Sequence, residues 1–359
     1  MKRIKCEYCD KKLILDNLED GNEYYCPRCK SLIYRAGESD AMIVSLTISS
    51  LMVFLFAISL PLLNVNILHD TQVSVVGSIE LLYKSDILSS IILTFTIIIV
   101  PILMMFLILL IIFSKKLHIM KKHLKILIGT YMYIKNWNMI SIYFIGLLVS
   151  MVKIKDISDM TILPGLWVNT LFVVLFFLTI KWFNPYDILH IHIRKGYKKD
   201  SILKTSMYII LAIIFIAPAN LLPIMPIYQY SVYFPNTLFD GVISFWDSGD
   251  FAVSIIIFIS SIILPIIKIL GIIFMLLMVK YDIFSSSKIL ATKYYILISK
   301  IGKFSMIDVY VVVLASAFIQ YDDLIRIEVG TAFIPFTLVV FFTVLANKSL
   351  DTKLIWNKK

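Results

Sequence analysis

Charged residues are scarce in this sequence of 359 residues. Only 16% of the residues are Asp, Glu, Lys or Arg, whereas 59% are hydrophobic, and the mean hydropathy is +0.88. A soluble domain of this size could not cover so much apolar surface. The composition therefore excludes an ordinary soluble protein and favours a protein embedded in a membrane.

Motifs for phosphate chemistry and for nucleophilic catalysis are also missing. The sequence contains no phosphate-binding glycine loop, Walker motif or nucleophile elbow. Its five histidines have no spacing typical of a metal site. These absences predict a protein that binds no nucleotide and is not an enzyme.

Long uncharged runs define the expected architecture. Three of them begin at Ala41, Ile87 and Phe251, and each exceeds the about 20 residues that cross a bilayer as a helix. We expect an all-α polytopic membrane protein with eight transmembrane helices, near residues 41–63, 88–113, 138–156, 163–183, 204–227, 251–279, 304–321 and 331–347.

Basic residues mark one side of the membrane. Most of the 34 Lys and Arg residues fall in segments that share one side if there are eight spans: 1–40, 114–125, 184–204, 280–303 and the residues after 347. The positive-inside rule then places both termini in the cytoplasm. Topology thus accounts for the basic loops without a nucleic-acid partner. Residues 1–40 lack the apolar core of a cleavable signal.

All four cysteines lie near the N-terminus, in the pairs Cys6-x2-Cys9 and Cys26-x2-Cys29. Thiolate pairs at this spacing close a tetrahedral site, which suits a redox-inert structural zinc ion. A reducing cytoplasm argues against disulfides. Iron in a rubredoxin-like knuckle is the alternative, because spacing separates the two metals poorly. We expect residues 1–40 to form a cytoplasmic zinc ribbon.

The rest of the chain aligns with itself. Residues 77–101 match 241–265 at an offset of 164, and the stretch from Trp137 matches the stretch from Phe304 at an offset of 167. An even number of spans in each half predicts a parallel repeat. We expect two four-helix bundles, at residues 41–183 and 204–359, joined by a basic cytoplasmic linker at 184–203.

Two charged residues interrupt spans of the second half. Lys268 lies inside the sixth span and Asp308 inside the seventh, where the first half has Met104 and Ser141. A charge at the centre of a span costs roughly 2.5–3.5 kcal/mol even on lenient insertion scales. We therefore expect a polar cluster that lines a hydrophilic cavity, with Ser261, Pro265, Ser305 and Thr343 as further members.

On the sequence alone, these charges also fit two simpler arrangements. Lys268 and Asp308 could form a buried ion pair that only fixes helix packing. Alternatively, Asp308 could be solvated, because five residues from Lys303 correspond to about 7.5 Å at about 1.5 Å per residue.

Prolines are expected to bend one span and to end another. Pro265 lacks an amide N–H, so we expect a kink near Ser261. The segment from Ala217 to Pro226 holds three prolines and Asn220, and it either lines the cavity, which we favour, or marks the exit from the membrane. The polar segment 245–250, FWDSGD, is expected to begin the sixth helix.

Together these features resemble the paraquat-inducible protein A family over nearly the whole chain. The resemblance rests on the four-cysteine head, the duplicated halves and the motifs PANLLPIM, GVISFWDSGDFAV, LPIIKI and FSMIDVYVV. It implies an inner-membrane component of an intermembrane lipid transport system in a double-membraned bacterium. It further implies tetraspanin-like bundles, phospholipid as cargo, an MCE-domain periplasmic partner, and a functional cluster at Lys268, Ser305, Asp308 and Thr343.

The sequence departs from the family pattern at one place. Many members carry a second four-cysteine ribbon between the halves, whereas residues 184–203 contain no cysteine. Two other functions also stay open. The cysteine head could transfer electrons in a membrane redox protein, or the chain could be a passive anchor for a periplasmic partner.

Overall fold

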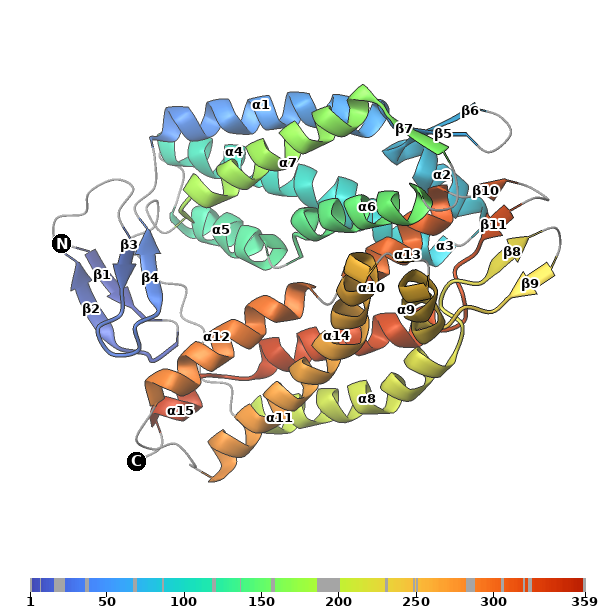
Figure 1. Ribbon diagram of the computed structural model, residues 1–359. Helices are drawn as coiled ribbons and strands as arrows, with labels where there is room; N and C mark the ends of the chain where they lie inside the picture. The colour runs from blue at the N-terminus through green and yellow to red at the C-terminus, as the bar shows by residue number, and fades with distance from the viewer. Residues whose placement is uncertain are drawn as a thin grey trace.

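The computed structural model describes residues 2–6, 8–15, 23–35, 39–66, 70–85, 87–117, 121–135, 137–155, 159–185, 201–229, 232–247, 249, 251–281, 288–304, 307–318, 320–321 and 325–357. Two helical halves lie one above the other in Figure 1. The N-terminal domain and both chain ends lie at one end of the molecule, and small β-sheets lie at the opposite end.

The N-terminal domain consists of two antiparallel hairpins. The first joins β1 (Lys2–Lys5) to β2 (Lys12–Leu15), and the second joins β3 (Glu23–Tyr25) to β4 (Leu32–Arg35). A domain this small has little hydrophobic core, and the four buried cysteines form its centre.

The first half is built from helices with short strands between them. Its elements are α1 (Asp40–Ser59), β5 (Pro61–Asn66), β6 (Asp70–Ser74), α2 (Val75–Ser85), α3 (Ile87–Leu93), η1 (Thr94–Ile99), α4 (Val100–Lys116), α5 (Lys121–Lys135), α6 (Ile140–Lys155), β7 (Asp159–Ile162) and α7 (Pro164–Trp182), where the α3, η1 and α4 segments form one continuous helix.

The second half follows the same order of elements, with an additional strand and a short terminal helix. They are α8 (Ser201–Leu221), β8 (Ile227–Gln229), β9 (Val232–Phe234), α9 (Leu238–Asp247), α10 (Phe251–Phe258), η3 (Ile259–Ile263), α11 (Leu264–Tyr281), α12 (Lys288–Phe304), α13 (Ile307–Phe318), β10 (Gln320–Tyr321), β11 (Ile325–Ile327), α14 (Phe333–Ser349) and the short α15 (Lys353–Asn357).

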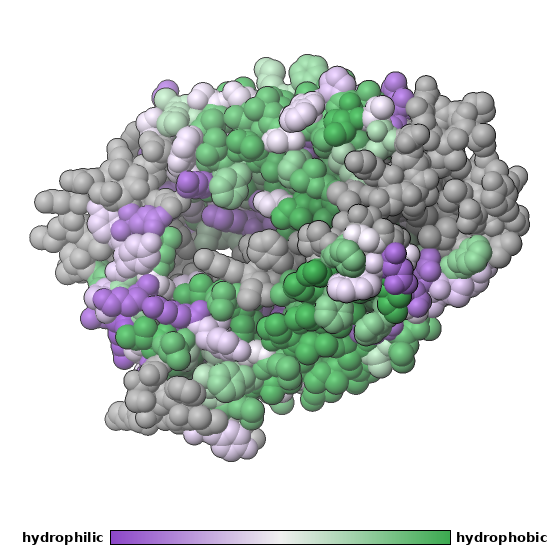
Figure 2. Space-filling view, in the orientation of Figure 1, coloured by the Kyte–Doolittle hydropathy of each residue, from purple (hydrophilic) through white to green (hydrophobic). Residues whose placement is uncertain are grey.

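Six helical stretches among the described residues are long and apolar enough to cross a membrane. They are Asp40–Ser59, Ile87–Lys116, Pro164–Trp182, Ser201–Leu221, Ser261–Val279 and Phe333–Trp356. Hydrophobic side chains cover much of the flanks of both halves in Figure 2. The expected third and seventh spans form the helices α6 and α13, of which the structure describes 16 and 12 residues, fewer than the about 20 of a full crossing.

The main helices of both halves contain a π-helical turn before a proline. η1 ends two residues before Pro101, and η3 ends two residues before Pro265. A proline cannot donate to the carbonyl four residues earlier and crowds it, and the wider turn relieves that clash. The irregularity expected at Pro265 is therefore a π-helical turn that contains Ser261.

Several elements were not expected from the sequence. The basic segments after α4 and α11 form the amphipathic helices α5 and α12, whose apolar residues gather on one face. The expectation that FWDSGD begins the sixth helix was wrong. Phe245–Asp247 end α9, Gly249 turns the chain with a φ of +87°, and α10 begins at Phe251.

Small sheets at the outer ends also depart from an all-α membrane domain. In the first half the strand order is β6-β5-β7, and in the second it is β10-β11-β8-β9, all antiparallel. The chain enters each sheet directly after a long helix, at Pro61 or within the segment from Leu222 to Pro226. The irregular backbone is thus paired within protein rather than exposed to lipid.

A glycine closes each of these junctions. A Cβ atom placed on Gly165 would lie 2.2 Å from the carbonyl oxygen of Pro61, and one placed on Gly330 would lie 2.2 Å from the carbonyl oxygen of Pro223. Only glycine allows two backbones to approach this closely. The same contact therefore fixes the last long helix of each half, α7 or α14, beside the end of its first, α1 or α8.

Candidate metal centre and transport site

Each cysteine pair sits in a knuckle of the same geometry. The amide of Asp10 donates to the carbonyl of Cys6 at 3.0 Å, and the amide of Lys30 donates to the carbonyl of Cys26 at 2.8 Å. Asp10 and Lys30 have φ angles of 63° and 60°, in the left-handed region. These tight turns aim both sulfurs of a pair at one point.

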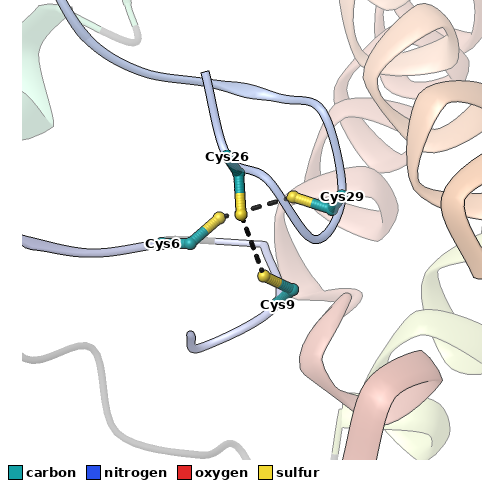
Figure 3. A group of neighbouring side chains, drawn as sticks. All are labelled: Cys6, Cys9, Cys26 and Cys29. Carbon is teal, nitrogen blue, oxygen red and sulfur yellow. Dashed lines mark hydrogen bonds between the residues drawn. The ribbon is translucent and has the colours of Figure 1, made fainter. Parts of the chain in front are cut away.

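The four sulfurs converge on a closed site, which Figure 3 illustrates. All four Sγ atoms lie within 4.8 Å of one another, and the Cys6–Cys29 and Cys9–Cys26 sulfurs are 3.5 Å apart. Four thiolates at a Zn–S distance of about 2.3 Å stand about 3.8 Å apart in a tetrahedron. The residues therefore fit a metal ion with four sulfur ligands and no open coordination position.

The ionisation of these buried thiols depends on a bound cation. Burial raises the pKa of the Cys9 and Cys29 thiols. Burial also acts on Cys26, but hydrogen bonds from the backbone N–H groups of Cys29 and Arg28 outweigh it and lower the pKa of that thiol. A bound cation supplies the charge that keeps all the ligands ionised.

Ser31 is a neighbour of the metal site that cysteine spacing does not reveal. Its buried hydroxyl lies 3.0 Å from the sulfur of Cys29 and 3.6 Å from that of Cys6. A hydroxyl at this place can donate to a metal-bound thiolate and steady the ligand. Its only sequence signal is its position two residues after the last cysteine.

Both knuckles also contact the second half of the chain. Tyr8 of the first knuckle meets the ring of Tyr295 on α12, with ring centroids 6.3 Å apart, and its carbonyl accepts from Thr352 at 3.2 Å. In the second knuckle, the guanidinium of Arg28 lies 4.7 Å from the ring centroid of Trp356 on α15. The residues between each pair of metal ligands therefore form the docking surface.

Two further contacts strengthen this docking. Lys353 forms an ion pair with Asp10 at 3.6 Å. The indole of Trp356 donates to the hydroxyl of Thr292 at 3.0 Å, which ties α15 to α12. The ribbon is thus joined to α12, the helix that leads into α13 and Asp308.

The expected polar cluster falls on helices of one bundle. Lys268 on α11 and Thr343 on α14 are each 1% exposed, and Ser261 in η3 is buried and has no hydrogen-bond partner among the described residues. The hydroxyl of Thr343 donates to the carbonyl of Val340 at 2.9 Å. The helices α8, α11 and α14 pack against one another.

Two members of the cluster lie at the edge of what is described. Asp308 belongs to α13, which packs against α14, but its side chain lies outside the described residues. Ser305 lies outside them altogether. The pairing of Asp308 with Lys268 therefore stays a prediction.

Asn220 lies where the sequence placed a broken helix. The helix α8 continues through Pro218 to Leu221, and the amide nitrogen of Asn220 donates to the carbonyl of Ile216 at 2.8 Å. Its amide oxygen is buried and has no partner among the described residues. Beyond Leu221, the carbonyls of Pro223 and Pro226 accept from Ala332 and Glu328, so this segment anchors the sheet junction.

Comparisons with known proteins identify relatives over the full length of the chain. A sequence model of the family described as "Paraquat-inducible protein A" matches residues 41–191 and 202–359. The "Lipophilic envelope-spanning tunnel protein A" of Escherichia coli strain K12 is 25% identical over an alignment of 397 positions, gaps included. The alignment covers 98% of this chain and 91% of that protein.

Two other relatives carry transport names. The "Probable intermembrane transport protein" of Haemophilus influenzae is 26% identical and covers 99% of this chain and 96% of its own length. The "Intermembrane transport protein PqiA" of Escherichia coli strain K12 is 25% identical, with 100% and 96% covered. No solved structure matches. The two family matches together span most of the sequence, and this multi-pass membrane protein therefore belongs to the paraquat-inducible protein A family.

Proposed function

We propose that the protein is an inner-membrane component of an intermembrane lipid transport system. Three relatives that cover nearly the whole chain are named as intermembrane transport or envelope-spanning tunnel proteins, which supports a transport role over an enzymatic one. The cargo we assign is phospholipid, loaded into or taken from a periplasmic MCE-domain tunnel protein. The small sheets would face that partner, and both termini would be cytoplasmic.

We further propose that eight helices cross or enter the membrane, as a parallel repeat of two four-helix bundles. On this proposal the domains are the ribbon at 1–40, the repeats at 41–183 and 204–359, and the linker at 184–203. The common order of elements in the two halves supports the proposal. So does the π-helical turn before a proline in each.

The observation that carries the transport proposal is the burial of Lys268. A lysine with 1% exposure inside a candidate membrane span is expensive, and its counterpart Met104 indicates that the scaffold does not require it. Buried hydroxyls at Ser261 and Thr343 lie on the packed helices around it. Such a cluster suits a polar headgroup, with a cation for the phosphate.

The mechanism we propose is alternating exposure of a lipid-sized cavity in the second half. The cluster holds the headgroup through Lys268, Ser261, Ser305 and Thr343, while the acyl tails remain in apolar surroundings. We assign the coupling step to a change of protonation at Asp308 or Lys268. Asn220 and Pro265 shape the helix ends and turns that border this cavity.

Neutral substitutions in the cluster test this proposal. Asp308→Asn and Lys268→Ala are expected to abolish lipid transfer between donor and acceptor membranes while protein abundance and the melting temperature change little. Met104→Ala, at the matching place of the first half, should retain transfer. Normal transfer by both cluster variants would instead assign these residues to helix packing and favour a passive anchor for a periplasmic partner.

We assign the closed cysteine site to a structural zinc ion, which does not change oxidation state and therefore has no redox function. The four sulfurs also suit iron, which would favour a membrane electron-transfer protein. Elemental analysis and a visible spectrum of the purified protein separate the two. Zinc without visible absorption is expected, and stoichiometric iron with charge-transfer bands would contradict a purely structural site.

A further inference from the structure

The helix α9 exposes an apolar stripe that its counterpart hides. Phe239, Ile243 and Trp246, spaced i, i+4 and i+7, lie on one face and are 47%, 56% and 53% exposed. At the offset of 164 their counterparts on α2 are Val75, Ile79 and Leu82. Of these, Val75 is 3% and Leu82 0% exposed.

Different packing explains this contrast. The helix α2 packs against α1, α3 and α13, whereas the main partner of α9 is α10. In Figure 1 α9 and α10 lie side by side at the end of the second half that carries the small sheets. In the first half α2 therefore packs onto its bundle, whereas in the second half α9 leaves its apolar stripe exposed.

The exposed helix is nevertheless well defined. Thr237 and Asp240 form a capping box at its start, in which the Thr237 amide and hydroxyl donate to the Asp240 carboxylate at 2.9 and 2.7 Å. These hydrogen bonds lower the pKa of the Asp240 carboxyl. At its end, Trp246 packs edge-on against Phe251 with ring centroids 4.9 Å apart.

Exposed apolar residues continue from the stripe along the neighbouring helix. They are Phe251, Ile255, Phe258 and Ile259, all on α10 or at the start of η3. These residues lead into the candidate span Ser261–Val279, so they face the surroundings of a membrane helix. An amphipathic helix that joins such a surface near the membrane boundary is typical of one that contacts lipid.

Behind the stripe, buried polar residues recur every seven positions along α10, η3 and α11. Ser254, Ser261 and Lys268 are 1%, 3% and 1% exposed. Ser254 donates to the carbonyl of Val242 on α9 at 2.7 Å, so this polar row begins at α9 itself. Ser261 has no hydrogen-bond partner in the part of the chain that the structure describes.

In the first half, only the first of the three matching positions is polar. Ser90, the counterpart of Ser254, donates to the carbonyl of Ile79 on α2 at 3.2 Å. The next two positions are Ile97 and Met104, both buried and apolar. Of the two matched rows, only the one in the second half, where α9 leaves its apolar stripe exposed, therefore stays polar into the membrane interior.

We propose that α9 is the entry for a phospholipid from the membrane leaflet at the end that carries the small sheets. The acyl tails lie against Phe239, Ile243 and Trp246, and the phosphate passes along Ser254 and Ser261 to Lys268. Serine hydroxyls donate to phosphate oxygens, and the lysine supplies the opposite charge. The inference rests on the proposed function and adds the side of entry and the residues of the path.

Two photoreactive lipids test this entry on the unaltered full-length chain. The protein is placed in phosphatidylethanolamine nanodiscs that contain phosphatidylethanolamine with a diazirine either in the headgroup or in one acyl chain. After illumination, labelled peptides are mapped by mass spectrometry. We expect tail labelling of 239–246 and headgroup labelling of 254–261, with several-fold less headgroup labelling of the matched segment 90–97.

Equal headgroup labelling of 90–97 and 254–261, or labelling of neither, would overturn the proposed entry. So would unchanged labelling of 254–261 after Ile243→Asn combined with Trp246→Ala, since these changes remove the apolar stripe. Tyr83→Ala, an exposed position on α2, is the matched control and should leave the labelling as it is.

The same samples separate this inference from the proposed function. If Lys268→Ala and Asp308→Asn abolish lipid transfer but 254–261 is never labelled, the transport proposal stands and the entry fails. If 254–261 is labelled but both variants transfer lipid normally, lipid enters here and the assigned transport cluster fails.

Discussion

The two halves of the chain share an order of helices and strands but differ in the side chains that they bury. Each half runs from a long helix into a small sheet, through a short amphipathic helix, a helix with a π-helical turn, and three further helices, after which the second half ends with the short α15. Among the described residues, the second half alone carries a buried lysine, and its helix α9 exposes the stripe of Phe239, Ile243 and Trp246 where Val75 and Leu82 of the first half are buried. The scaffold is therefore stable without these polar residues, and their presence in one half calls for a functional reason.

The halves also meet through matching positions. Tyr143 on α6 and Tyr310 on α13, counterparts at the offset of 167, pack edge-on with ring centroids 6.3 Å apart. A contact between equivalent residues is what a two-fold arrangement produces near its axis. This contact therefore places equivalent helices of the two halves, α6 and α13, against each other.

The N-terminal ribbon adds a third difference, because its described contacts go to α12, α15 and the residues between α14 and α15. Removal of the metal should have the largest effect of the changes considered, since structural zinc contributes about 10–16 kcal/mol of apparent binding free energy at pH 7. Chelation is expected to unfold the ribbon and to speed amide hydrogen exchange in α12 and α15, with much less change in α5. Mass spectrometry of exchanged peptides measures this.

Two controls accompany metal removal. Trp356→Ala should speed exchange in α15 while the metal content stays the same, because only the docking contact is lost. Metal retention should also fall as the pH falls, since the raised pKa of Cys9 and Cys29 means that protons compete with the metal for these thiols. Equal exchange in α5 and α12 after chelation would contradict selective docking on the second half.

The next largest effect is expected when buried polar residues of the second half are replaced by the apolar residues at the matching positions of the first half. Ser261→Ile and Lys268→Met install the residues of Ile97 and Met104. Each change should reduce lipid transfer at least about tenfold, which corresponds to about 1.4 kcal/mol. Thermal stability should stay the same or rise, because each change replaces a buried polar group by an apolar side chain that the first half already packs. Transfer rates in reconstituted vesicles and melting curves measure both outcomes.

The reciprocal change sharpens the same comparison. Met104→Lys places a lysine in a first half whose covering helix is closed and whose neighbouring position is Ile97. It should lower stability without adding transport, because the charge has no polar row to join. A gain of transfer in Met104→Lys would mean that the lysine alone makes the site.

The sequence predicted the elements that depend on local pattern and missed those that depend on packing. Long apolar runs located the six helices that can cross a membrane, and cysteine spacing located the four sulfurs that converge. Alignment of the halves picked out Lys268 as an exception. The exposure of the apolar stripe on α9 could not be predicted from its sequence, because α2 and α9 are both amphipathic. They differ in the helices that pack against them.

Other features were missed for a similar reason. The strands of the small sheets are short, and the pairs β5–β7 and β8–β11 join residues far apart in the chain. Docking of the ribbon through Tyr8 and Arg28 joins the N-terminal residues to the C-terminal end. Neither relation leaves a periodic signal in the sequence.

A smaller effect is expected at the two glycine junctions, where the halves should behave alike. Gly165→Ala and Gly330→Ala each force a methyl group against a proline carbonyl oxygen, and overpacking of this kind costs about 1–3 kcal/mol. Thermal melting in detergent should therefore fall for both variants. Gly129→Ala is the control, since a Cβ at that position meets no atom of the described residues within 4 Å beyond its own helix backbone. A clear tolerance at only one junction would show that the halves are built differently there.

The smallest effect is expected where the halves touch. The hydroxyl of Ser150 on α6 shares its one proton between the carbonyl of Gly146, at 2.8 Å, and that of Val311 on α13, at 3.3 Å. Its counterpart at the offset of 167 is Ala317. Hydrogen bonds between membrane helices contribute about 0.6 kcal/mol on average, so Ser150→Ala should lower the free energy of unfolding by about that amount in a reversible unfolding assay. Ser316→Ala is the matched control, because that buried hydroxyl has no hydrogen-bond partner among the described residues, and its removal should leave stability unchanged or raise it. Unchanged stability of Ser150→Ala would mean that the contact between the halves does not depend on this hydrogen bond.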